Sequence, residues 1–159
     1  MSDDNDPSRS EALPPSAYFE LFNEIGIINQ LSSTEFERVL PHGLTQAQFG
    51  VLNHCMRLGD NKTPARLAAA FQLTRGTMTS TLKRMAAKEF IQLVPDAQDG
   101  RSKRVLLTDA GRAAHGDAIA AAVPLLIRVS GALSPEQIST LLPILRKLRI
   151  WLDDNRSES

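Results

Sequence analysis

The amino-acid sequence predicts a mainly α-helical protein with a small β-hairpin wing, arranged as a winged helix-turn-helix and a dimerisation lobe built from the terminal helices. Three observations predict this fold class. Apolar residues recur at spacings of three and four through most of the 159 residues, as in amphipathic helices. Two predicted helices, residues 64–71 and 74–88, are separated only by a tight turn. Two strand-like runs, residues 91–94 and 103–107, follow them.

The first predicted helix begins after Pro14-Pro15 and extends to about residue 40, where Pro41-His42-Gly43 ends it. Its apolar residues form one stripe, as expected for a helix with one buried face. The stripe consists of Tyr18, Leu21, Phe22, Ile25, Ile28 and Leu31. Residues 1–13 lack such periodicity and are expected to form a flexible acidic tail, and residues 154–159 a second tail.

A second predicted helix begins at a capping box, in which Thr45 and Gln48 bind the free backbone N–H groups of the first turn. Leu44 and Phe49 have the spacing of a hydrophobic staple, and Gly59 marks the end of the helix. These signals define the start of a lobe that we expect to span residues 41–107.

The third and fourth predicted helices form the helix-turn-helix, with Pro64 opening the third and Thr74 capping the fourth. At 100° per residue, one side of the fourth helix would pack inward, and the other would be small, hydroxylic and basic. The inward residues are Met78, Thr81, Leu82 and Met85, and the outward residues are Gly76, Thr77, Thr79, Ser80, Lys83 and Arg84. Such an outer face suits the major groove of DNA.

The strand-like runs flank a polar tip at residues 95–102, in which Asp99-Gly100 supplies the turn of a hairpin. Arg101 follows that turn and is expected at the end of the hairpin, away from the body of the protein. A slender cation in that position suits the minor groove, where a narrow width concentrates negative potential.

Two long helices are predicted after the hairpin. Thr108 caps the first, which extends to about residue 129, and Ser134 caps the second, with Gln137 completing a capping box. The second has an apolar face too broad for a free surface. Pro124 and Pro143 lie inside these helices and are expected to kink them.

Charge is distributed unevenly, although the whole chain sums to zero. Residues 74–104 contain seven of the 18 Lys and Arg but only three of the 18 Asp and Glu, whereas residues 1–20 carry a net charge of −4. A neutral total does not argue against DNA, because phosphate attraction depends on the local field. The predicted DNA contacts are Thr74, Arg75, Thr77, Thr79, Ser80, Arg84, Arg101 and Lys103.

Simpler roles compete with several of these assignments. Arg84 could instead pair with Asp96 or Asp99, the hydroxyls could face only solvent, and Lys88 is expected to be an ordinary surface residue.

The segment from Asp96 to Gly111 carries a specific pattern, D-x-x-D-x-R-x-x-x-V-x-L-T-x-x-G, at every fixed position. With the order of the helices and the Leu-Thr-Gln-Ala-Gln-Phe run at residues 44–49, it resembles the multiple antibiotic resistance regulator (MarR) family of winged-helix transcription factors. The resemblance covers about residues 18–153. It implies a homodimer whose terminal helices interlock, so that residues 14–40 and 108–153 would form the dimerisation lobe. It also implies that this dimer binds a pseudo-palindromic operator in double-stranded DNA, usually as a repressor. It also implies that residues 74–88 form the recognition helix and that Arg101 is the wing-tip arginine.

The same resemblance implies a small-molecule effector, with aromatic compounds as candidates, in a crevice between the two lobes that the first, second and fifth predicted helices would line. Phe22, Ile25, Phe49 and His54 are conceivable lining residues, although core packing is favoured for each, and the ligand-binding residues stay unknown. Peroxide sensing is disfavoured, because the reactive cysteine of that branch lies in the first helix and Cys55 lies in the second. Metal sensing is disfavoured, because His42, His54 and His115 lack ligand spacing.

Two other classes of function are alternatives to a DNA-binding regulator. A winged helix that binds partner proteins instead of DNA is the alternative, and retention of the basic residues argues against it. An enzyme is not supported, since the sequence has no phosphate-binding loop and no nucleophile with a local base, and no cofactor is expected. Cys55 is expected to be a core thiol rather than a redox sensor. Without a signal peptide or long apolar run, we expect no membrane partner and a cytoplasmic location.

Overall fold

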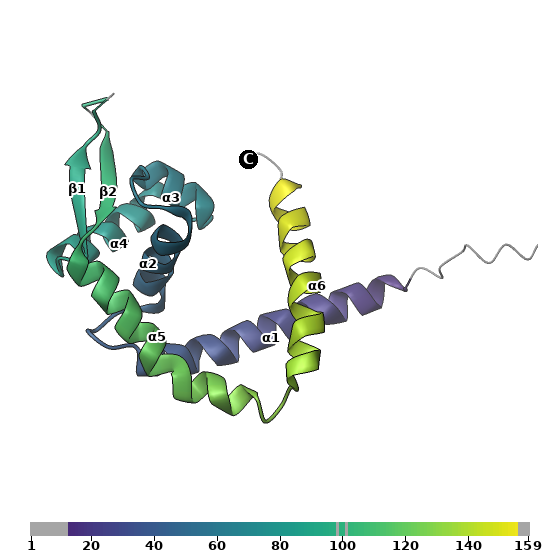
Figure 1. Ribbon diagram of the computed structural model, residues 1–159. Helices are drawn as coiled ribbons and strands as arrows, with labels where there is room; N and C mark the ends of the chain where they lie inside the picture. Colours follow the sequence, from purple (N-terminus) through teal and green to yellow (C-terminus); the bar gives the residue numbers. More distant parts are fainter. Residues whose placement is uncertain (1–12, 98, 101, 156–159) are drawn as a thin grey trace, which may run out of the picture.

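The computed structural model describes residues 13–97, 99–100 and 102–155. Along this part of the chain, six helices and two strands follow one another in the order shown in Figure 1. They are α1 (Pro15–Val39), α2 (Gln46–Leu58), α3 (Pro64–Ala70), α4 (Arg75–Ala87), β1 (Ile91–Pro95), β2 (Lys103–Leu107), α5 (Asp109–Val129) and α6 (Pro135–Asp154). The predicted mainly α-helical fold with a β-hairpin wing is confirmed.

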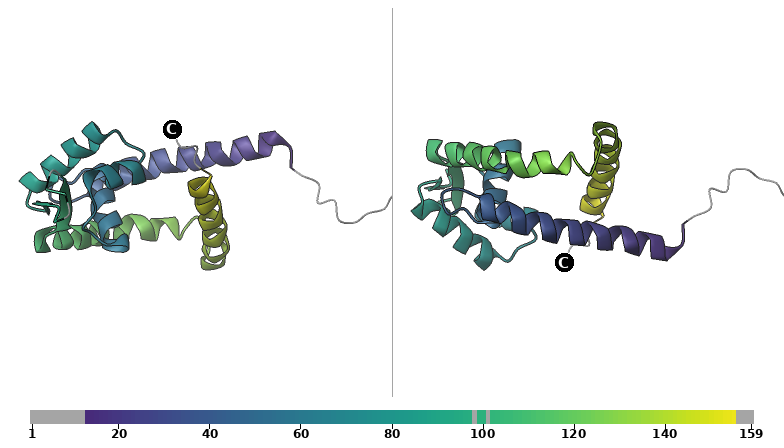
Figure 2. Two further views of the ribbon diagram at one scale, coloured as in Figure 1. Left: turned by 90° about the horizontal axis from the view of Figure 1, so that it is seen from above. Right: turned by 90° about the horizontal axis from the view of Figure 1, so that it is seen from below.

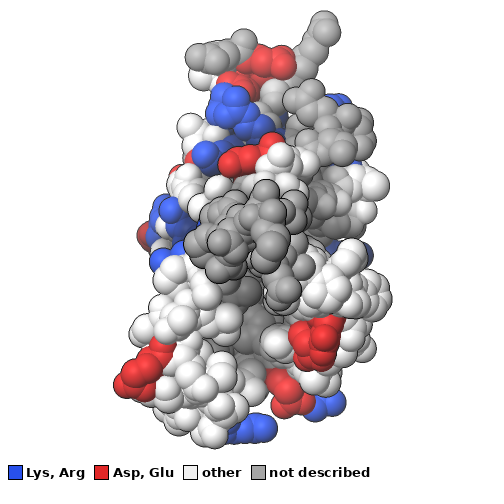
Figure 3. Space-filling model, turned by 90° about the vertical axis from the view of Figure 1, so that its right-hand side faces the viewer, with Lys and Arg blue, Asp and Glu red and all other residues white. Residues whose placement is uncertain are grey.

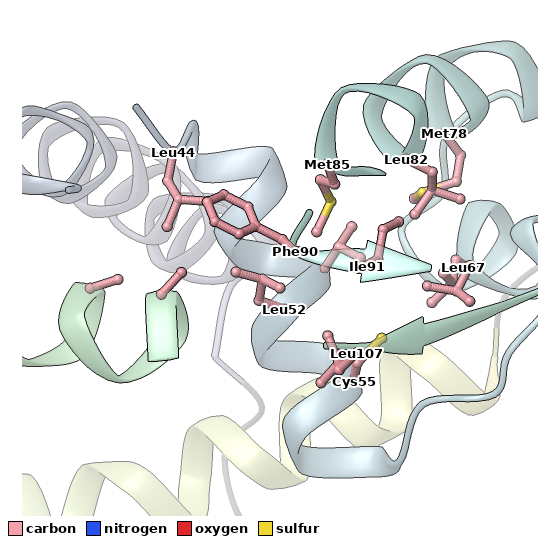
Figure 4. Packing of buried hydrophobic residues seen from close by; sticks show 14 of the residues in the cluster. Leu44, Leu52, Cys55, Leu67, Met78, Leu82, Met85, Phe90, Ile91 and Leu107 are labelled. Atoms are coloured by element: carbon pink, nitrogen blue, oxygen red, sulfur yellow. The ribbon is translucent and has the colours of Figure 1, made fainter. Parts of the chain in front are cut away.

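A single hydrophobic core lies among α2, α3, α4, the hairpin and the first half of α5 (Figure 4). Its largest fully buried side chains come from four of these elements, so each element is held by apolar contacts with the others. They are Leu52, Leu67, Met78, Leu82, Met85, Ile91, Val51 and Val105.

Side-chain caps fix where five of the helices begin. Thr45 and Ser134 form the predicted capping boxes with Gln48 and Gln137, and Thr63, Thr74 and Thr108 accept hydrogen bonds from backbone N–H groups of the first turn. Each cap satisfies a donor that the helix itself leaves free. The predicted starts of α2, α3, α4, α5 and α6 are therefore confirmed.

The hairpin pairs β1 with β2 antiparallel, with Leu93 opposite Val105. The segment after α2 adds a second, short pairing, because Asn61 donates to the Val105 carbonyl at 2.7 Å and Val105 donates to the Lys62 carbonyl at 2.9 Å. The root of the hairpin is thus joined to α2 as well as to α4.

Helices α1, α5 and α6 extend beyond this core. The views in Figure 2 show α1 and the end of α5 leaving the winged lobe in the same general direction, with α6 standing across them. No residue of α1 or α6 is buried. Both α5 and α6 continue past their internal prolines, Pro124 and Pro143. None of the described helices is long and apolar enough to cross a membrane.

Candidate nucleic-acid interface

The candidate interface is built on α4, whose two faces differ as predicted. Met78, Leu82 and Met85 are at most 1% exposed and hold the helix against the core. The outward residues Gly76, Thr77, Thr79, Ser80, Lys83 and Arg84 are all exposed, as is Arg75. Burial of one face therefore fixes which side chains α4 presents to solvent.

The first turn of α4 uses some of its hydroxyls internally. Thr74 Oγ1 accepts a hydrogen bond from the Thr77 N–H at 3.1 Å and lies 2.8 Å from Thr77 Oγ1. Thr81 Oγ1 donates to the Thr77 carbonyl at 3.1 Å. Thr74 and Thr77 therefore position the start of α4, which limits what their hydroxyls can offer to a ligand.

Five side chains on the outer face are differently placed. Within the described residues, no hydrogen bond or ion pair engages the side chains of Arg75, Thr79, Ser80, Lys83 or Arg84. Three cations and two hydroxyls are thus available on one helical face. Such a set can bind phosphate oxygens or base edges.

The hairpin adds Lys103, which is exposed at the start of β2, where its Cα pairs with Pro95. Arg101, the predicted wing-tip contact, lies outside the described residues. Arg104, which follows Lys103 on β2, faces the protein instead. Its Nε donates to Asp96 Oδ2 at 2.8 Å, and its Nη1 donates to the Asn61 carbonyl at 2.9 Å.

This arrangement bears on the competing role of Arg84. The aspartate Asp96 is 8% exposed and pairs with Arg104, so the structural partner of that carboxylate is an arginine of the hairpin itself. Arg84 has no ion pair with any described carboxylate.

Lys88 is not the plain surface residue that the sequence predicted. Its Nζ donates to the Gly43 carbonyl at 2.5 Å and to Gln48 Oε1 at 3.1 Å. Gln48 is 3% exposed and also forms the capping box of α2. Lys88 therefore ties the end of α4 to the start of α2. Sequence reasoning missed this because the partners lie about 40 residues away and nothing local marks them.

Burial determines the chemistry of Cys55 and His115. Cys55 is 2% exposed, and desolvation raises the pKa of its thiol to about 11, so the thiolate form is scarce at neutral pH. Burial lowers the pKa of His115, whose Nε2 lies 3.2 Å from Asn53 Oδ1. The predicted core thiol is confirmed. No group of three His, Cys, Asp or Glu side chains in the described ranges could hold a metal ion.

Away from α4, the long helices expose many apolar side chains. Phe19, Ile28 and Leu31 on α1, Leu126 and Ile127 on α5, and Ile144 and Trp151 on α6 are each at least 60% exposed. Figure 3 views the protein from the right-hand side of Figure 1, and the lower half of that face is mostly uncharged surface, with acidic and basic groups toward its edges. So large an exposed apolar surface is unusual for a monomer.

A groove of about 880 Å³ lies between the two lobes. Its lining includes Phe22 and Ile25 from α1, His54 and Arg57 from α2, and Leu145 and Arg149 from α6. The resemblance implied a lining from α1, α2 and α5, whereas in the structure α6 takes the place of α5 in the lining. Phe49 was a conceivable lining residue, but it packs elsewhere, with its ring centroid 4.8 Å from Phe36 and 5.5 Å from the His115 ring.

A family model described as MarR family matches residues 42–102, which contain α2, α3, α4 and β1. The protein named transcriptional activatory protein BadR, from Rhodopseudomonas palustris, is 28% identical over 114 residues. That match covers 70% of this chain and 63% of the relative, so the chain spans less than two thirds of that relative's length.

Several solved structures share the fold. Wild-type MarR from E. coli in its apo form has 26% identity and a TM-score of 0.70, covering 87% of this chain and 98% of that one. A mutant MarR from E. coli, complexed with operator DNA, has 25% identity and a TM-score of 0.71, covering 86% and 99%. BldR from Sulfolobus solfataricus has 22% identity and a TM-score of 0.74, covering 86% and 97%. The family match, the relative and the shared fold agree: residues 42–102 of this chain match the MarR family, and the described chain shares the winged helix-turn-helix fold of the MarR structures.

Proposed function

We propose that this protein is a homodimeric, sequence-specific DNA-binding regulator that brings two copies of α4 and the hairpin to a pseudo-palindromic operator. The observation that carries the proposal is the outer face of α4, where three cations and two hydroxyls have no partner within the described chain. The operator complex of the E. coli MarR mutant, which has the same fold, supports it. Residues 41–107 form the DNA-binding lobe, and residues 14–40 and 108–153 form the dimerisation lobe.

Each predicted contact has a chemical role in this proposal. The guanidinium groups of Arg75 and Arg84 suit guanine edges or phosphates, and Thr79 and Ser80 suit phosphates or base edges. Lys103 acts as a phosphate contact. Thr74 and Thr77 contribute through the helix start that they fix. Arg101 is proposed for the minor groove from its place in the sequence.

The dimer follows from the apolar surfaces of α1, α5 and α6. Apolar side chains that a lone chain leaves in water gain about 25 cal/mol for each Å² that a partner covers. A second copy is the proposed partner, since a two-fold dimer gives both copies the same contacts and places two copies of α4 on one duplex.

We propose repression that is relieved by a small aromatic acid in the groove between the lobes. Apolar side chains from α1 and α6 would cover the ring, and Arg57 and Arg149 would attract the carboxylate. The effector must favour a spacing of the two lobes that does not fit DNA, because equal binding to both states shifts nothing. Titrating aromatic acids into an operator complex tests this. If an aromatic acid releases the operator from the parent protein but not from Arg149→Ala, the site is supported. If no acid releases the operator from the parent protein, the effector is removed from the proposal.

The direction of regulation needs a separate measurement, because BadR, the relative from Rhodopseudomonas palustris, is named as an activator. Transcription in vitro from a promoter that carries the selected operator would fall on addition of a repressor and would rise on addition of an activator.

Selection of random duplexes by the purified protein tests the central proposal. A bound pool with two related half-sites in inverted orientation is the expected result. Failure to enrich any sequence, together with binding to another protein instead, would favour the alternative of an interaction module without DNA.

A further inference from the structure

Gly76 is the second residue of α4, within the proposed DNA interface, and it is not explained by the fold of its own chain. Glycine loses more conformational freedom on folding than any other residue, so a glycine inside a helix lowers its stability relative to alanine. The reasons available within a chain are a backbone angle that other residues avoid or a neighbour that leaves no room for a Cβ.

Neither reason applies to Gly76. Among the described glycines, only Gly43 and Gly59 have a positive φ. A Cβ built on Gly76 would meet only Thr74 Oγ1, at 3.9 Å, which is an ordinary van der Waals contact. By contrast, a Cβ on Gly111 would lie 2.0 Å from the Phe90 carbonyl oxygen, and one on Gly50 would lie 3.3 Å from the Phe71 ring.

The position of Gly76 on α4 indicates what lies against it. At 100° per residue, the centre of the buried face falls between Met78, Leu82 and Met85, and Gly76 lies on the opposite side. Ser80 and Lys83 continue the same line along the helix. Gly76 is therefore on the outermost line of the interface, flanked by the two arginines Arg75 and Arg84.

We infer that Gly76 is the point of closest approach between α4 and the floor of the major groove, where the DNA leaves no room for a Cβ. This inference rests on the proposed function and adds a residue that determines affinity by being small. A close approach lets Ser80 reach base edges with a short side chain and lets the flanking arginines reach either side of the groove.

The test separates stability from DNA binding. Gly76→Ala and Gly116→Ala each place a methyl group on an exposed helical glycine, and a Cβ on Gly116 meets nothing within 4 Å in the described part of the chain. Both variants are expected to unfold at the same temperature as the parent or higher, because alanine favours the helix. Gly76→Ala alone should lose operator affinity, by about ten-fold or more, as expected for a displaced base contact.

A larger side chain sharpens the measurement. Gly76→Leu should bind more weakly than Gly76→Ala, and both should keep the parent's salt dependence, since no charge changes. Gly76→Ala that binds the operator as tightly as the parent overturns the inference and leaves the proposed function intact. Equal losses in Gly76→Ala and Gly116→Ala overturn it too. Failure of the parent itself to bind any duplex would instead reject the proposed function.

Discussion

At the scale of single residues, burial decides which reactive groups are available. Cys55 and His115 are both capable of chemistry in principle, but each lies in the core or at its edge. Desolvation disfavours their charged forms, raising the pKa of the thiol and lowering that of the imidazole. The single cysteine of the chain is therefore a packing residue, as its place on an apolar helical face indicated.

His115 makes stability depend on pH in a predictable direction. Its folded-state pKa lies below the ordinary 6.5, so the unfolded chain takes up a proton first as the pH falls. Stability is fully present above that value and is lost as the pH falls through it toward the lowered pKa of the folded state. His115→Phe keeps a ring against Phe49 and removes the titrating group.

Urea unfolding of both proteins at several pH values between about 7.5 and 5 checks this. The free energy of unfolding should fall more steeply in the parent than in His115→Phe. Since burial also lowers the pKa of His54, the variant keeps part of the slope. Identical slopes in the two proteins would contradict the assignment.

At the scale of elements, the helices could be predicted and the ties between them could not. The caps at Thr45, Thr74 and Ser134 are local, because each side chain binds a backbone group three residues away. The tie from Lys88 to Gln48 joins residues far apart in the chain. Local pattern contains no information about that distance, so a lysine near the end of α4 resembled any surface lysine.

Arg104 and Lys103 are neighbours on β2 with different roles. Arg104→Gln removes an ion pair to a buried carboxylate and should cost about 1–3 kcal/mol of stability. Lys103→Gln changes an exposed residue and should alter stability by less than about 0.5 kcal/mol. Lys103→Gln should nevertheless weaken operator binding, because it removes a proposed phosphate contact.

Denaturant unfolding and operator titration of the two variants measure both effects. Each variant serves as the control for the other, because each removes one positive charge and the two positions are adjacent. Equal stability of the two variants would remove the structural role assigned to Arg104.

At the scale of the whole molecule, the sequence predicted apolar faces on the terminal helices but not how they meet. The stripe on α1 and the broad face of α6 are periodic features of the sequence. Which helices enclose the groove depends on how α6 returns after α5, and no local signal predicts that return.

Leu141 on α6 and Arg66 on α3 test the proposed dimer. Leu141 lies within the apolar face of α6, whereas Arg66 is exposed on the winged lobe. Leu141→Asp should disrupt the dimer, since a charge in an apolar interface loses its hydration, and Arg66→Asp should not. Sedimentation velocity of the parent and both variants at equal concentration gives the oligomeric state. A monomeric parent, or a dimeric Leu141→Asp protein, would contradict the proposed interface.

The salt dependence of DNA binding tests the central claim most directly. If each subunit neutralises about three or four phosphates, the logarithm of the affinity should fall with the logarithm of the salt concentration with a slope of roughly −5 to −7. Fluorescence anisotropy with the selected duplex gives this slope. Arg84→Ala, which removes one proposed contact per subunit, should make it shallower by about two. A slope near zero for the parent protein would contradict the account that two copies of α4 and its hairpin bind one duplex.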